Sequence, residues 1–164
     1  MGPTEAHSLH SSLRLERGAV VSFVGAGGKT SAMFRLADEL RRAGWRVVTT
    51  TTTHLAESQL VLAPTTLGLA ELPGLREKLD ASGHCLIIGP PDHQGRVYGV
   101  PPGLVADLHR RPDVDAVLVE ADGSRSRPLK APAEHEPVVP PVTTHLIPVV
   151  GMEEKERDME ALFM

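Results

Sequence analysis

The chain has 164 residues and a mass of 17.6 kDa, about the length of one domain. Its 17 basic and 21 acidic side chains give a formal charge of −4, which argues against a general nucleic-acid-binding protein. The single cysteine, Cys85, excludes an intramolecular disulfide and a multi-cysteine zinc site. No apolar run approaches the roughly 20 residues of a membrane span, and the first ten residues do not resemble a signal peptide. We therefore expect a cytoplasmic protein with no membrane or nucleic-acid partner.

Predicted strands and helices alternate along the chain. Short apolar runs rich in β-branched residues predict strands at 19–24, 45–50, 84–88, 115–120 and 145–150. Apolar residues at helical spacing predict helices at 30–42, about 72–79 and 104–110, and residues 89–103 have the Pro and Gly content of a loop or hairpin. This order predicts an α/β fold with a mainly parallel sheet. We expect a polar lead-in at 1–17, a domain at 18–152 and a charged helical tail at 153–164.

A glycine-rich loop joins the first strand to the first long helix. Its amide groups and the start of the helix suit an anion, while a lysine can reach the β- and γ-phosphates and a threonine hydroxyl can bind Mg²⁺. The expected nucleotide-binding residues are Gly25, Ala26, Gly27, Gly28, Lys29, Thr30 and Ser31. Phe23 stands where the standard P-loop has its first glycine, so the loop is two residues shorter and resembles that of the Mur ligases. The alternative is a glycine-rich turn that binds nothing.

Two carboxylates stand at the end of the predicted strand 115–120. Glu120 and Asp122 lie two positions apart, so in extended chain both side chains would point the same way. Ligands of open α/β sheets bind at the carboxyl ends of the strands, where one carboxylate could hold Mg²⁺ and the other could orient an attacking group. We therefore treat Lys29, Glu120 and Asp122 as catalytic candidates and Thr30, Glu120 and Asp122 as metal candidates. The alternative is an ordinary turn at residues 122–123.

Two further segments supply candidates for substrate binding. Thr52, Thr53 and His54 leave the second strand at the sheet edge that carries the glycine loop, although threonine is also common in strands for structural reasons. Arg125 and Lys130 follow the acidic strand end and could neutralise a phosphate or an anionic substrate. A solvated surface loop is the alternative for these two cations.

Three blocks of the sequence read FVGAGGKTSAMFRLA, VVTTTTTH and VEADGSRSRPLKAPAEHEPVVP. These blocks resemble the YqeC family of accessory proteins for selenium-dependent molybdenum hydroxylases, and the resemblance covers about residues 18–150. It implies a three-layer P-loop NTPase-like fold and supports the glycine loop as the nucleotide loop. It also supports a set of site candidates: Thr52, Thr53, His54, Glu120, Asp122, Arg125 and Lys130. Family members continue well past the last expected strand, which leaves the completeness of any acceptor site open.

The expected function is that of a Mg²⁺-dependent P-loop protein that binds ATP or GTP. The resemblance implies an NTPase that assists maturation of a molybdenum hydroxylase, with that client or its cofactor as partner. One alternative is a nucleotide-gated delivery or binding module with little turnover. A second alternative is a Mur-ligase-like ATP-dependent activating enzyme, although no separate acceptor domain is visible in this length.

Overall fold

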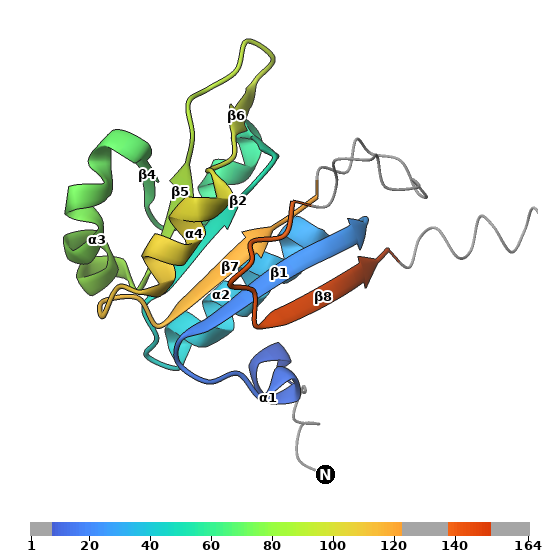
Figure 1. The fold of residues 1–164 in the computed structure, drawn as a ribbon, viewed down its shortest axis with the longest axis vertical. Coiled ribbons are helices and arrows are strands. Elements are labelled where there is room, and N and C mark those ends of the chain that lie inside the picture. The colour runs from blue at the N-terminus through green and yellow to red at the C-terminus, as the bar shows by residue number, and fades with distance from the viewer. Residues whose placement is uncertain (1–7, 123–137, 152–164) are drawn as a thin grey trace, which may run out of the picture.

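The computed structural model describes residues 8–122 and 138–151. Six parallel strands form its central sheet, in the order β4-β5-β2-β7-β1-β8 (Figure 1). The strands span β1 Ala19–Ala26, β2 Val47–Thr51, β4 Thr66–Gly68, β5 His84–Ile88, β7 Ala116–Glu120 and β8 His145–Val150. The strand that leads into the glycine loop, β1, therefore lies directly beside the acidic strand β7.

Helices cover both faces of the sheet. α2 (Lys29–Arg42) lies on one face, and α3 (Leu75–Ser82) and α4 (Pro102–His109) lie on the other (Figure 1). Successive strand residues point to opposite faces, so Val21 packs in the cluster with Leu36 of α2, whereas Val20 packs with Val105 of α4. The structure confirms the predicted α/β class with a parallel sheet and two helical layers. Burial on both faces explains the nearly continuous apolar runs of β1 and β7.

Short elements fill the connections between these strands and helices. α1 (Leu9–Leu13) precedes β1, within the predicted lead-in, and packs next to α2. β3 (His54–Ala56) pairs antiparallel with β6 (Arg96–Tyr98) in a separate two-stranded sheet. Two 3₁₀ segments, η1 (Glu57–Leu62) and η2 (Leu69–Gly74), flank β4. The predicted tail at 153–164 lies outside the described residues.

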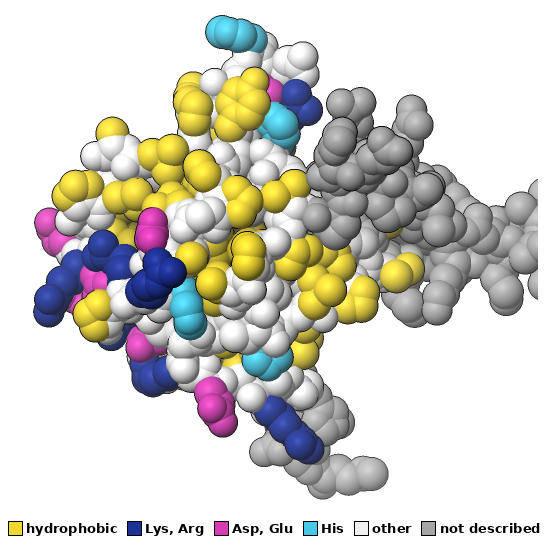
Figure 2. All heavy atoms as spheres, viewed as in Figure 1, with side chains coloured by type: hydrophobic (Ala, Val, Ile, Leu, Met, Phe, Trp, Pro, Cys, Tyr) yellow, Lys and Arg dark blue, Asp and Glu magenta, His cyan; other side chains and the backbone are white. Residues whose placement is uncertain are grey.

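β8 forms one edge of the central sheet and leaves apolar side chains in contact with solvent. Leu146 and Val150 are 55% and 66% exposed. Figure 2 shows the molecule from the same side as Figure 1, with hydrophobic side chains over the region where β1 and β8 lie. The neighbouring residues Ile147 and Val149 point to the opposite face and pack against the core beneath α2.

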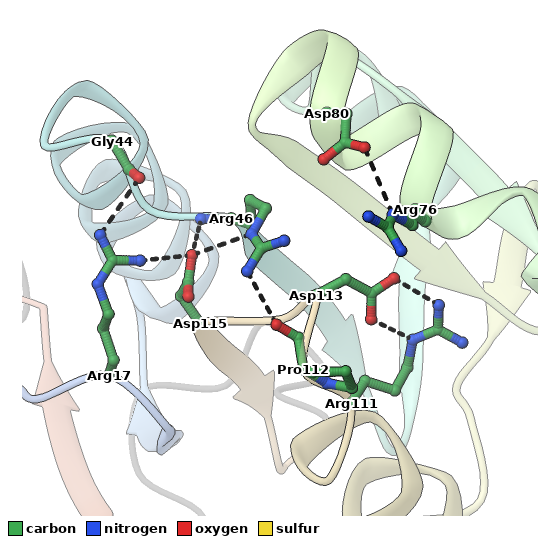
Figure 3. A network of polar contacts seen from close by, with 9 residues as sticks. All are labelled: Arg17, Gly44, Arg46, Arg76, Asp80, Arg111, Pro112, Asp113 and Asp115. Carbon is green, nitrogen blue, oxygen red and sulfur yellow. Dashed lines mark hydrogen bonds and ion pairs between the residues drawn. The ribbon is translucent and has the colours of Figure 1, made fainter.

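A network of ion pairs fastens the amino ends of the strands (Figure 3). Asp115, just before β7, contacts Arg17 at 2.7 Å and Arg46 at 3.3 Å, and it also accepts the Arg46 backbone N–H at 2.8 Å. Burial alone would raise the pKa of Asp115, but these hydrogen bonds and charges outweigh burial and lower it. The network connects the segments that precede β1, β2 and β7, at the ends of these strands opposite the glycine loop.

Candidate functional site

The glycine loop joins β1 to α2 through backbone conformations that favour glycine. Gly25, Gly27 and Gly28 have φ values of +103°, +64° and +82°. Gly28 is the N-cap of α2 and, having no side chain, makes no side-chain hydrogen bond to the first turn of that helix. The first amide groups of α2 thus keep their capacity to bind an anion.

The edge strand β8 supports the loop from one side. Gly25 pairs with Val149 in the parallel register, and a Cβ atom at position 25 would collide with the Val149 backbone oxygen. At Gly28 the corresponding Cβ would lie 3.7 Å from the Val149 side chain, which is an ordinary contact. The contact between β8 and the loop has no local signal in the sequence, because Gly25 and Val149 lie far apart along the chain.

Lys29 turns its side chain inward, under the loop. The side chain is only 1% exposed, and Nζ donates to the Gly25 carbonyl oxygen at 2.5 Å. Nζ also lies 3.0 Å from Asp122 Oδ1, and Asp122 Oδ2 accepts the Gly25 backbone N–H at 2.7 Å. The contact with Oδ1 is an ion pair without hydrogen-bond geometry. The loop therefore holds a carboxylate between one of its amides and its lysine.

The second carboxylate, Glu120, contacts the next residue of the loop. The Thr30 hydroxyl donates to Glu120 Oε2 at 2.7 Å. Burial raises the pKa of the Glu120 carboxyl, against the lowering effects of the Thr30 hydrogen bond and of Lys29. A hydroxyl and a carboxylate at this distance are the hard oxygen donors that Mg²⁺ prefers.

Strand pairing brings both carboxylates to the loop. Phe23 of β1 is the register partner of Glu120, and the Ala121 backbone N–H donates to the Phe23 carbonyl oxygen at 3.0 Å. This second contact carries the chain of residues 121–122 along β1 to Gly25. Both predicted acidic side chains reach the loop, but they have different partners: Glu120 contacts Thr30, and Asp122 contacts Lys29.

The threonine run uses its hydroxyls within the protein. Thr52 donates to the Val138 carbonyl oxygen at 2.9 Å, and the Thr51 and Thr53 hydroxyls lie 3.2 Å apart. His54 is exposed on β3, with its ring centroid 4.8 Å from that of Tyr98. Among the described residues, the hydrogen bonds of Thr52 and Thr53 do not reach the glycine loop.

Tyr98 was not predicted as part of this exposed aromatic pair, although its being the chain's single tyrosine was a possible signal. Of the other candidates, Ala26 ends β1 and Ser31 is exposed on α2. Arg125 and Lys130 lie outside the described residues.

Within residues 8–122 and 138–151, no three His, Cys, Asp or Glu side chains gather as a metal site. A Mg²⁺ ion held with a nucleotide takes only one or two protein carboxylates, because phosphates and waters supply its other ligands. The Thr30–Glu120 pair fits that requirement. In the same described part of the chain, no helix combines the length and the hydropathy needed to cross a bilayer.

Comparisons with known proteins agree with the resemblance noted in the sequence. The family model described as "YqeC protein" matches residues 21–163. A relative from Escherichia coli (strain K12), with the name "Uncharacterized protein YqeC", is 41% identical over 145 residues, which is 83% of this chain and 53% of the relative. The chain thus spans about half the length of this curated relative, and no solved structure matches. Both the family match and the shared residues show that this chain belongs to the YqeC family.

Proposed function

We propose that the glycine loop binds the phosphates of ATP or GTP together with Mg²⁺. The observation that carries this proposal is the buried Lys29 ammonium, which together with the Gly25 amide already holds an anionic group. A lysine placed under a loop of amides at a helix start is the arrangement that stabilises β- and γ-phosphates.

The two carboxylates have different roles in this proposal. Thr30 and Glu120 hold Mg²⁺, which supplies charge neutralisation at the phosphates when it is bound. Lys29 orients the terminal phosphates and stabilises negative charge that develops on them during phosphoryl transfer. Asp122 contacts Lys29 rather than Thr30, so we assign it to the phosphate side of the site.

On the resemblance noted in the sequence, we also propose a role in maturation of a molybdenum hydroxylase. In this role the protein is an NTPase, and its client or the client's cofactor is the partner. A delivery module with slow turnover is the second candidate, because the loop lysine is already paired within the protein. Turnover measured with and without a client enzyme separates the two: rapid hydrolysis without client supports the NTPase, and binding without hydrolysis supports the module.

Replacement of the loop lysine tests nucleotide binding. Lys29→Met keeps an apolar stem of similar size under the loop but removes the ammonium, so calorimetry with Mg²⁺ and non-hydrolysable analogues of ATP and GTP is expected to detect no binding. Arg35→Met is the matched control, because it removes an exposed positive charge from the same helix. Equal affinities of wild type and Lys29→Met for the nucleotide would refute the proposal.

A further inference from the structure

Asp122 occupies the position at the loop where a bound anion would be expected. Its Oδ2 accepts the Gly25 N–H at 2.7 Å, and its Oδ1 lies 3.0 Å from Lys29 Nζ. A backbone amide and a buried ammonium are the same two kinds of donor that a P-loop offers to phosphate oxygens. A carboxylate and a phosphate both carry negative charge on oxygen, so they compete for these donors.

Hydrogen bonds fix the backbone next to this carboxylate. The Ala121 N–H donates to the Phe23 carbonyl oxygen at 3.0 Å, and the Val138 N–H donates to the Ala121 carbonyl oxygen at 2.8 Å. Asp122 is the residue directly after Ala121, and its side chain is 20% exposed. Rotation of the side chain toward solvent can therefore release Lys29 without breaking the sheet.

We infer that Asp122 is an autoinhibitory anion, which closes the phosphate site in the nucleotide-free protein and must leave Lys29 and Gly25 before a polyphosphate binds. This inference rests on the proposed function and adds regulation of the same site. The lysine remains paired in both states: with its own carboxylate when the site is empty, and with phosphate when it is filled. The exchange avoids the cost of an unpaired buried ammonium.

The contact has two consequences of opposite sign. Without ligand, removal of the Asp122 charge destabilises the fold, because Lys29 loses its ionic partner. With ligand, the same removal tightens binding, because the phosphate no longer displaces a carboxylate. A residue with only a structural role would produce the first effect alone.

The test measures binding of inorganic pyrophosphate in EDTA, where a metal-ligand role of Asp122 is silent. Asp122→Asn is expected to bind pyrophosphate about tenfold more tightly than wild type, which corresponds to about 1.4 kcal/mol. Asp38→Asn is the matched control: it also removes one negative charge, from an exposed pair with Arg41 and Arg42, and should bind like wild type. If Asp122→Asn does not fold, Asp122→Ser is measured in the same way.

The outcomes separate this inference from the proposed function. Equal or weaker pyrophosphate binding by Asp122→Asn, with wild type binding nucleotide in Mg²⁺, overturns the autoinhibitory role and leaves the proposed function standing. If wild type, Asp122→Asn and Asp38→Asn bind neither nucleotide in Mg²⁺ nor pyrophosphate in EDTA, the proposed function and the inference are overturned together. Pyrophosphate binding by Asp122→Asn but not by wild type supports both.

Discussion

Replacement of Gly25 by alanine tests the geometry of the loop independently of any ligand. Gly25 has φ of +103°, and the new Cβ would meet the Val149 backbone oxygen, with the Val149 nitrogen at 3.2 Å. These atoms belong to strand β8, so relief of the collision requires movement of paired backbone rather than rotation of a side chain. We expect Gly25→Ala to separate the loop from β8.

The size of the effect follows from a comparison with Gly28→Ala in the same loop. Gly28 has φ of +82° and space for a Cβ, so alanine there costs only the left-handed conformation, about 1 kcal/mol. At Gly25 the backbone collision adds to that strain, and we expect a loss of about 3 kcal/mol or more. Urea unfolding followed by circular dichroism measures the free energy of unfolding of both variants. In thermal unfolding, the larger loss in Gly25→Ala should lower Tm by about 6–12 °C. Similar losses for the two variants would show that β8 does not support the loop as described.

Two further predictions concern ionisable groups outside the loop. Asp115→Asn is expected to lower the free energy of unfolding by about 2 kcal/mol at neutral pH, whereas Asp107→Asn, in an exposed pair, should change it by less than about 0.5 kcal/mol. Because the folded-state pKa of Asp115 is lowered, its contribution is complete above the ordinary pKa of a carboxyl, and the difference from Asp115→Asn should vanish as the pH falls through the lowered value in acid denaturation series. Burial lowers the pKa of His84 to about 4, so the unfolded chain binds the additional proton between about pH 6.5 and 4. As the pH falls over that range, the free energy of unfolding of the wild type should decrease by up to about 1.4 kcal/mol per pH unit. A His84→Gln variant with an equally steep decrease would contradict the assignment of this pH dependence to His84.

The long, strongly patterned elements could be predicted from the sequence. The run Ala19–Ala26 and the helical spacing in Lys29–Arg42 come from burial of one or both faces, so each carries its own local signal. The second predicted strand starts later than expected, at Val47. The Trp45 backbone N–H donates to the Leu40 carbonyl oxygen near the end of α2, and Arg46 belongs to the ion-pair network at the amino ends of the strands. β4 and β6 have three residues each, too few for a periodic pattern, and both depend on pairing with distant strands.

The candidate site could be predicted in its composition but not in its pairings. Glu120 and Asp122 were recognised because acidic residues stand at the end of a buried strand, and the loop was recognised because glycines precede Lys29 and Thr30. Which carboxylate contacts Thr30 depends on the placement of β7 beside β1, which the sequence does not specify locally. The hydroxyls of Thr52 and Thr53 were candidates by position, and their hydrogen bonds within the protein become visible only in three dimensions.

The strand β7 has an aspartate before its first residue and another shortly after its last, and the two are held differently. Asp115 is contacted by the Arg46 backbone amide, the Arg46 guanidinium and Arg17, and it lies at the amino end of β7, away from the loop. Asp122 has one amide and one ammonium as partners, and both are groups that a phosphate can also bind. The partners of Asp115 could also bind phosphate, so the difference between the two aspartates is one of position. A polyphosphate bound at the glycine loop competes for the partners of Asp122, whereas those of Asp115 lie at the opposite ends of the strands.

This difference predicts how ligand changes the two stability losses. Tighter binding raises the stability of the liganded fold by RT times the logarithm of the affinity ratio. Tenfold tighter binding by Asp122→Asn should therefore reduce its stability deficit relative to wild type by about 1.4 kcal/mol at saturating pyrophosphate. The deficit of Asp115→Asn should stay constant, because its affinity does not change. Denaturant unfolding of the three proteins across a pyrophosphate series measures both quantities, and parallel responses of the two variants would contradict the division of roles along β7.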